Sequence, residues 1–197
     1  MNKNNIIIDI AQDFSDKDRR RAEKILELAW KVDNYIDNKF KTEHTELYNK
    51  WHGNHCIQTA VMICGILNEV QSVYPQVVYA IMEDKHKGKI VHYNHAYVHV
   101  VDKLPHHSVK HYAIDMPRND RQQLFVAGDS SIDVRCETTF DYQGYKDIKI
   151  LATQNMDFKK LIMFEVEYFT NKPSYCLFKE IKDKFQHEID ELNKGEE

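Results

Sequence analysis

The sequence has few of the residues that interrupt regular structure. Only 6 Gly and 4 Pro occur among its 197 residues, which excludes collagen-like and linker-rich architectures. Hydrophobic residues make up 42% and charged residues 29% of the chain, an ordinary balance that excludes a mostly disordered protein. The length suits one large domain, and no repeat or internal boundary divides it. We therefore expect a single domain over residues 1–197.

Long apolar runs, closely spaced cysteines and a basic surplus are also missing. The apolar run Ile6–Ile8 is too short for the core of a signal peptide, and no stretch reaches the length of a membrane span. The 4 cysteines include no C-x-x-C pair, which is typical of free thiols in a reducing compartment. The formal net charge of -4 argues against a nucleic-acid partner. These absences predict a cytoplasmic protein with no membrane and no nucleic-acid partner, although a protein exported without a signal peptide would have the same sequence pattern.

Two helices are predicted in the first part of the chain. Ser15–Asp18 has the form of a capping box, and apolar residues then recur with helical spacing over Ala22–Phe40. The basic run Arg19–Arg21 is expected on the solvated side of this helix. A second helical pattern covers Ile57–Val70 and is apolar around most of its circumference, so this helix should be buried.

After Pro75 the hydrophobic period changes from helical to strand-like. The sequence predicts six strands and a C-terminal amphipathic helix: strands Gln76–Met82, Ile90–Val101, Val109–Asp115, Ile132–Glu137, Asp147–Leu151 and Leu161–Phe169, and helix Tyr175–Leu192. Helices that precede an antiparallel meander, instead of alternating with single strands, indicate an α+β fold.

Cys56 lies at the predicted start of the buried helix, directly after Gly53-Asn54-His55. A thiol at a helix N-terminus faces backbone N–H groups that have no intrahelical partner and the positive end of the helix dipole. This position favours the thiolate, the nucleophilic form of cysteine, and the same N–H groups can stabilise an oxyanion. Cys64 lies two turns inside the helix, where cysteine is usually a small buried hydrophobe. Cys56 is therefore the candidate nucleophile.

A nucleophilic cysteine needs a base, and the base needs a group that orients it. His95 lies within one predicted strand and Asp115 at the end of the next. If these strands pair through the turn Lys103–His107, the imidazole and the carboxylate come side by side at the sheet edge facing the helix start. Singly, His95 could be a structural histidine and Asp115 a turn residue, so the interpretation depends on the combination. His55 is a second candidate base.

These segments together resemble the transglutaminase-like branch of the papain-like cysteine enzymes. The resemblance covers residues 51–117 and depends on three motifs. The first is Gly53-Asn54-His55-Cys56 before an apolar helix, and the second is His95-Ala96-Tyr97-Val98, which is similar to the family's His-Ala-Trp-Val motif. The third is Tyr112-Ala113-Ile114-Asp115-Met116-Pro117, which is similar to the family's Asp-Pro strand end. The order Cys, His, Asp also suits the arylamine N-acetyltransferases, which share the core. The resemblance implies a papain-like α+β fold in which a nucleophile helix packs on an antiparallel sheet, with extra N- and C-terminal helices.

By the same resemblance, Cys56 is the nucleophile, His95 the general base and Asp115 the residue that orients it. The implied reaction is attack on an amide, thioester or ester carbonyl through an acyl-enzyme, as in a protease, deamidase, amidase or transglutaminase. The substrate would be a protein, a peptide or a small amide or ester, with no cofactor and no metal. The sequence departs from the family pattern at Tyr97, where Trp is usual, and at His55, where the residue before the cysteine is usually small or acidic.

Two other interpretations stay open. The 11 histidines include the pairs His52-x-x-His55 and His92-x-x-His95, with His99, His106, His107 and His111 nearby. Four imidazoles, or three with Cys56 or Asp115, would suit zinc in a metal-binding protein or a metal-dependent hydrolase. Alternation along a strand, however, places His92 and His95 on opposite faces. The other interpretation is a catalytically inactive papain-like binding module, because a fold does not define a function.

Overall fold

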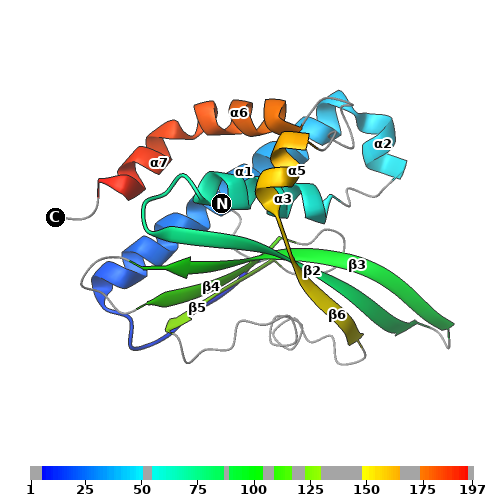
Figure 1. Ribbon diagram of the computed structural model, residues 1–197, viewed down its shortest axis with the longest axis horizontal. Coiled ribbons are helices and arrows are strands. Elements are labelled where there is room, and N and C mark those ends of the chain that lie inside the picture. Colours follow the sequence, from blue (N-terminus) through cyan, green and yellow to red (C-terminus); the bar gives the residue numbers. More distant parts are fainter. Residues whose placement is uncertain are drawn as a thin grey trace.

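The protein is described by a computed structural model over residues 6–50, 55–86, 89–103, 109–116, 123–129, 148–164 and 174–194. These residues form six strands and six helices (Figure 1). The strands are β1 (Ile6–Ile10), β2 (Val73–His86), β3 (Lys89–Asp102), β4 (Lys110–Asp115), β5 (Gln123–Asp129) and β6 (Ile148–Met156). The helices are α1 (Asp16–Glu43), α2 (Thr45–Lys50), α3 (Cys56–Leu67), α5 (Phe158–Phe164), α6 (Ser174–Lys184) and α7 (Gln186–Asn193).

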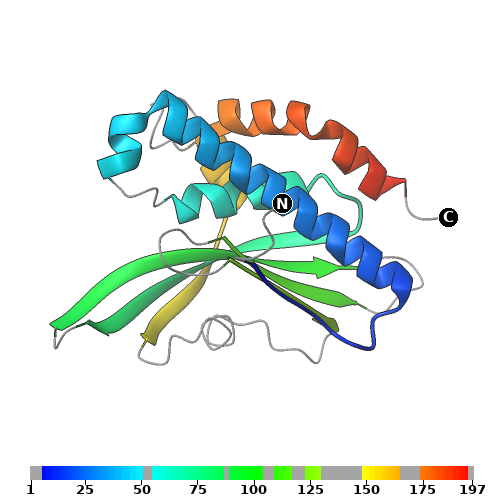
Figure 2. The ribbon, with the colours of Figure 1, turned by 180° about the vertical axis from the view of Figure 1, so that it is seen from behind.

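All the described strands belong to one sheet, in the spatial order β1-β5-β4-β3-β2-β6. β1 runs parallel to β5, and the other neighbouring pairs are antiparallel. The described helices lie on one face of the sheet, as Figures 1 and 2 show from opposite sides. The α+β class predicted from the sequence is confirmed. The sheet is mixed instead of wholly antiparallel, because the N-terminal segment adds a parallel strand.

Helix α1 begins where the sequence predicts. Ser15 Oγ accepts a hydrogen bond from the backbone N–H of Asp18 at 3.1 Å, so the first turn has a side-chain cap. The apolar stripe between Ala22 and Phe40 is buried in the core. A helix of 28 residues is stabilised mainly by burial of such a stripe, since helix propensity alone contributes little.

Side chains alternate between the two faces of a sheet, and the burial pattern identifies the face that the helices cover. Ala96, Val98 and Val100 of β3 belong to the same core cluster as the buried residues of α1 and α3. Tyr97 and Ala113 are buried as well but lie outside that cluster. On β3 the even-numbered residues therefore face the helices, and the odd-numbered residues face away from them.

One basic residue of α1 is buried, so the prediction of a solvated face is wrong for part of Arg19–Arg21. Arg21 is 8% exposed and forms a bidentate ion pair with Asp102, with Nε–Oδ2 and Nη2–Oδ1 distances of 2.7 and 3.2 Å. Arg21 also donates to the backbone carbonyls of Gln71 and Leu192. These contacts tie α1 to β3 and α7, and they give the buried guanidinium the partners that its burial requires.

The chain forms helix α5 at a place where a strand is predicted. The prediction of a strand over Leu161–Phe169 is wrong in its described part, because that part belongs to the helix. Asp157 accepts a hydrogen bond from the backbone N–H of Lys160 at 3.2 Å and so caps the first turn. Ile162 packs against α3 at Gly65, where a Cβ atom would lie only 2.6 Å from Ile162 Cδ1. The helix is therefore selected by its cap and by tertiary burial, against the strand propensity of its sequence.

The remaining element predictions are mostly confirmed. Predicted strands Gln76–Met82, Ile90–Val101 and Val109–Asp115 correspond to β2, β3 and β4, and the strand predicted from Asp147 corresponds to β6. The predicted terminal helix is divided at Phe185 into α6 and α7. The predicted strand Ile132–Glu137 lies outside the described residues. In the ranges that the structure describes, no helix is long and apolar enough to cross a membrane.

Candidate active site

The structure brings His95 and Asp115 together, as the sequence predicts. β3 and β4 pair in antiparallel register with Val98 opposite Ile114, which places the end of β4 beside the strand that carries His95. His95 Nε2 lies 2.8 Å from Asp115 Oδ1. The histidine is 4% exposed and the aspartate 0% exposed. A hydrogen bond between groups so far removed from water is stronger than one at the surface.

This hydrogen bond determines where the imidazole carries its proton. An ionised carboxylate can only accept, so Nε2 of His95 donates to Asp115. In the neutral ring the lone pair then lies on Nδ1, which is the nitrogen able to accept a proton from a thiol. The pair has the two properties that a catalytic histidine needs from its carboxylate, a fixed tautomer and support for the imidazolium.

Cys56 is the first residue of α3 and is partly exposed. Its side chain lies in a narrow crevice between the helix and the sheet. The helix contributes Cys56, Thr59, Ala60 and Ile63 to the lining, and the strands contribute Ala96, Tyr97, Val98, Ile114 and Met116. The cysteine therefore lies at the N-terminus of a buried helix, where the sequence places it, and directly above β3.

Cys56 and His95 lie on opposite sides of β3. Ala96 and Met116, which line the Cys56 crevice, belong to the core on the helix side, whereas His95 and Asp115 alternate with them and point away. No hydrogen bond joins the described side chains of Cys56 and His95. The described pairing of β3 with β4 reaches only as far as Val98.

His55, the second candidate base, has both ring nitrogens engaged away from the thiol. Its Nδ1 lies 2.8 Å from Thr59 Oγ1, and its Nε2 lies 3.2 Å from Asp37 Oδ1. The Tyr48 hydroxyl donates to the same carboxylate oxygen at 2.8 Å. Since the carboxylate accepts from Nε2, Nδ1 accepts from the Thr59 hydroxyl. His55 thus fixes the start of α3 against α1 and α2, and so holds Cys56 in place.

The other described cysteines differ from Cys56 in their surroundings. Cys64 is 0% exposed, and burial raises the pKa of its thiol well above the ordinary value, which leaves it unreactive. Cys176 lies exposed on α6. Cys136 lies outside the described residues.

The histidines of the described residues do not form a cluster suited to a metal ion. His99 Nε2 and His111 Nδ1 lie 3.2 Å apart with their rings stacked, and His92 is paired instead with Glu83. Within the described ranges no group of three or more histidine, cysteine or acidic side chains is placed to bind a metal. His52, His106 and His107, which the metal interpretation also uses, lie outside those ranges.

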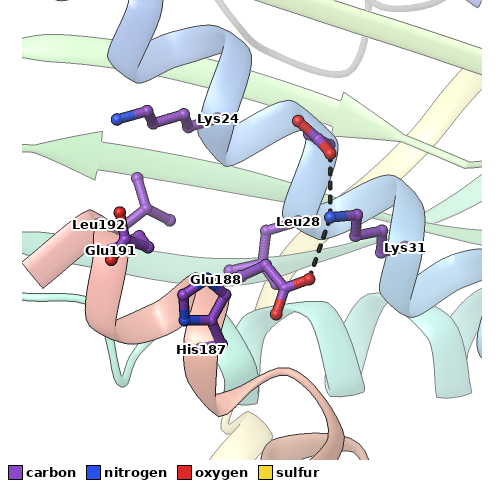
Figure 3. Close-up of a pocket in the computed structure, with 8 residues that line it drawn as sticks. Lys24, Leu28, Lys31, His187, Glu188, Glu191 and Leu192 are labelled. Atoms are coloured by element: carbon purple, nitrogen blue, oxygen red, sulfur yellow. Dashed lines mark hydrogen bonds and ion pairs between the residues drawn. The ribbon is translucent and has the colours of Figure 1, made fainter.

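A second hollow, of about 240 Å³, lies on the helical layer between α1 and α7 (Figure 3). Lys31 bridges two carboxylates there, with Nζ 2.9 Å from Glu27 Oε1 and 3.0 Å from Glu188 Oε1. The hydrogen bond to Glu27 raises the pKa of Lys31 above its ordinary value. Figure 3 shows Lys24 pointing away from this pair and His187 at the other end of the hollow. The hollow is lined mostly by charged residues, with no cysteine, serine or threonine among the described residues that line it, unlike the mostly apolar pockets that usually bind substrates.

The chain has no significant match among protein-family models, curated proteins or solved structures. The resemblance to the transglutaminase-like enzymes therefore depends on the motifs and their spacing alone.

One polar residue on the helix side of β3 is missing from the sequence-based candidates. Asn94 is exposed and lies two positions before Ala96, which lines the Cys56 crevice, so both residues lie on the same side of the strand. Its parity can be read from the sequence, but only after Ala96 is known to face the helix. The motif His95-Ala96 identifies the histidine as a candidate but gives no reason to include Asn94.

Proposed function

We propose that the chain is a cysteine-dependent enzyme with a papain-like, transglutaminase-like core. In this proposal Cys56 attacks an amide, thioester or ester carbonyl, and His95 and Asp115 act as base and orienting carboxylate. The buried hydrogen bond between His95 and Asp115, which the motif order Cys-His-Asp anticipates, is the observation that carries the proposal. The position of Cys56 at the N-terminus of a buried helix supports it.

The proposed reaction has two halves. The Cys56 thiol gives its proton to Nδ1 of His95, and its sulfur forms a bond to the carbonyl carbon, whose oxygen becomes an oxyanion. Backbone N–H groups in the first turn of α3 are placed to stabilise that oxyanion. When the intermediate collapses, the leaving amine, thiol or alcohol takes the proton from His95. Water or an amine then attacks the thioester, loses its proton to His95, and releases Cys56.

The first proton transfer requires the imidazole to reach the thiol from the other face of β3. We infer that it does so at the edge of β3 beyond Val98, where the described pairing with β4 ends. Catalytic hydrogen bonds are often incomplete in the absence of substrate and tighten when it binds. We expect the contact between Cys56 and His95 to form in this way, with Asp115 holding the other ring nitrogen.

Acylation by p-nitrophenyl acetate, an activated ester, tests the proposal because no natural substrate is needed. Intact-protein mass spectrometry should find an acetyl group on Cys56 in the wild type. Cys56→Ala and His95→Ala should each abolish the acetylation. Cys64→Ser is the matched control, because it alters a buried thiol of the same helix, and it should leave acetylation unchanged. Acetylation that continues at the wild-type rate in His95→Ala would remove His95 as the base.

A further inference from the structure

Helix α2 and the start of α3 share one carboxylate oxygen of α1. Asp37 Oδ1 accepts a hydrogen bond from the Tyr48 hydroxyl at 2.8 Å and another from His55 Nε2 at 3.2 Å. Hydrogen bonds to an ionised carboxylate are stronger than those between neutral groups. Because both donors use the same oxygen, a change at Tyr48 alters the acceptor that holds His55.

The imidazole of His55 is closely packed. Its side chain is 0% exposed, and the Phe40 ring meets it edge to face with 5.3 Å between the ring centroids. The Tyr48 ring lies 6.4 Å from the imidazole, at a tilt of 43°. Packing confines the plane of the buried ring, and the hydrogen bond to Asp37 determines the position of its Nε2 atom.

The position of His55 determines that of Cys56, the next residue of the chain. The backbone carbonyl of His55 accepts a hydrogen bond from the Thr59 N–H at 3.0 Å, and His55 Nδ1 accepts one from the Thr59 hydroxyl at 2.8 Å. The backbone and the side chain of His55 therefore both hold the first turn of α3. That turn contains Cys56 and the N–H groups assigned above to the oxyanion.

α2 is a short surface helix that follows the end of α1 (Figure 1). It has 6 residues and none of them is buried, although Leu47 and Tyr48 pack partly against the core. A helix of this length has little stability of its own. Its position therefore depends on contacts such as the hydrogen bond from Tyr48 to Asp37.

We propose that Tyr48 is a positioning residue for Cys56, so that α2 controls the reactivity of the nucleophile. The proposal rests on the function proposed above, in which Cys56 attacks a carbonyl group. Tyr48 fixes the Asp37 carboxylate, Asp37 fixes His55, and His55 fixes the first turn of α3. Without the Tyr48 hydroxyl, the Asp37 side chain, which is 27% exposed, can turn toward water, and the thiol loses its alignment.

Tyr48→Phe tests this role, because it removes the hydroxyl and keeps the ring. Tyr35→Phe is the matched control, since the Tyr35 hydroxyl also donates to a carboxylate, that of Glu180 on α6. Tyr35 lies on α1 and its ring packs against Phe185. Urea denaturation confirms that both variants are folded under the assay conditions.

Acetylation of Cys56 is measured over a range of p-nitrophenyl acetate concentrations. Tyr48→Phe should lower the limiting rate about ten-fold, since small misplacements of reacting groups slow reactions by such factors. The half-saturating concentration should not change, because only the thiol is displaced. Tyr35→Phe should behave like the wild type. An unchanged limiting rate in Tyr48→Phe, or an equal loss in Tyr35→Phe, would overturn the proposal.

The variant His55→Asn tests whether the effect of Tyr48 passes through His55. An asparagine amide occupies the position of Nδ1 but is too short to reach Asp37. In the His55→Asn background, Tyr48→Phe should therefore cause no further loss of rate. Independent effects of the two substitutions would multiply instead, and that result contradicts the path through His55.

Failure of the function proposed above gives a different result, since Cys56 of the wild type is then not acetylated. In that case nuclear magnetic resonance tests the contacts directly. The Nε2–H proton of His55 is buried and hydrogen-bonded, so it should exchange slowly with water in the wild type and in Tyr35→Phe. Tyr48→Phe should speed this exchange about ten-fold. Equal exchange in the two variants would contradict the positioning role.

Discussion

Cys56 and Ala96 line the same crevice between α3 and the sheet, whereas His95, the residue before Ala96 on β3, is not among the described residues that line it. A shift of one position along a strand changes the face on which a side chain lies, so the proposed nucleophile and its proposed base lie on different sides of β3. The hydrogen bond from His95 to Asp115 holds the imidazole on the side of β3 that faces away from the helices. In the proposed reaction the imidazole has to reach the thiol from that side.

The substitution Asp115→Asn tests the orienting role of the carboxylate. An asparagine amide has the shape of the carboxylate but can donate to Nε2, which would move the imidazole proton to Nδ1 and remove the basic nitrogen that the proposed reaction uses. We expect acetylation of Cys56 by p-nitrophenyl acetate to slow by roughly 10²–10⁴. Asp157→Asn is the control, because it retains a capping side chain at α5 far from the pair. Unchanged acetylation in Asp115→Asn would make Asp115 a strand-ending residue only.

The buried ion pair between Arg21 and Asp102 should be sensitive to the loss of one partner. Arg21→Met removes the ion pair and leaves the Tyr112 hydroxyl as the donor to the buried Asp102 carboxylate, among the hydrogen bonds of the described residues. We expect a loss of about 3–5 kcal/mol in the free energy of unfolding, measured by urea denaturation. Arg20→Met changes the neighbouring exposed position and should alter stability by less than about 0.5 kcal/mol. Equal effects of the two substitutions would contradict the buried role of Arg21.

Thr59→Val tests whether the histidine before the nucleophile fixes the start of α3. Valine has nearly the shape of threonine but lacks the hydroxyl that donates to His55 Nδ1. Because Thr59 is 2% exposed, the loss of this buried hydrogen bond should cost about 1–3 kcal/mol of unfolding free energy. Acetylation of Cys56 should slow as well. Thr42→Val removes an exposed hydroxyl of α1 and serves as the control; a loss of stability no greater than its own would refute the prediction.

His99 should make the stability of the protein depend on pH. Burial, and secondly the nearby His111, lower the pKa of His99 below its ordinary value of 6.5. The unfolded chain then binds a proton at this residue more readily than the folded chain, so this contribution to stability is full above the ordinary value and is lost as the pH falls below it.

The measurement compares urea midpoints at about pH 7.5 and about pH 5.5. The wild type should lose more stability than His99→Gln over this interval. His92→Gln, at a side chain that is 60% exposed, should behave like the wild type. Parallel pH profiles of the wild type and His99→Gln would show that His99 does not titrate differently on folding.

The parts of the fold that local patterns determine could be predicted from the sequence. The Ser15 cap, the apolar stripe of α1 and the strands around His95 each follow from a spacing of a few residues. The pairing of His95 with Asp115 could also be predicted, because their strands follow each other closely in the sequence and pair in the sheet. The prediction of a strand over Leu161–Phe169 followed strand propensity and left out the cap that Asp157 provides for α5.

The features that could not be predicted from the sequence depend on contacts between segments that are distant in the chain. The residues near Arg21 in the sequence do not indicate that it is buried, because its partner Asp102 lies on another element. Likewise, alternation divides β3 into two sets of residues, but the sequence does not say which set the Cys56 helix covers. The packing of Ala96 and Val98 under α3 decides this.

The alkylation of two cysteines in the same molecule tests the central claim most directly. Cys176 is exposed on α6 and serves as an internal reference for an ordinary thiol. At about pH 6, where free thiols are mostly protonated, peptide mass spectrometry should find that iodoacetamide labels Cys56 faster than Cys176 in the wild type, and that this advantage disappears in His95→Ala. If Cys56 reacts no faster than Cys176, or equally fast without His95, the protein does not contain the proposed cysteine–histidine nucleophile.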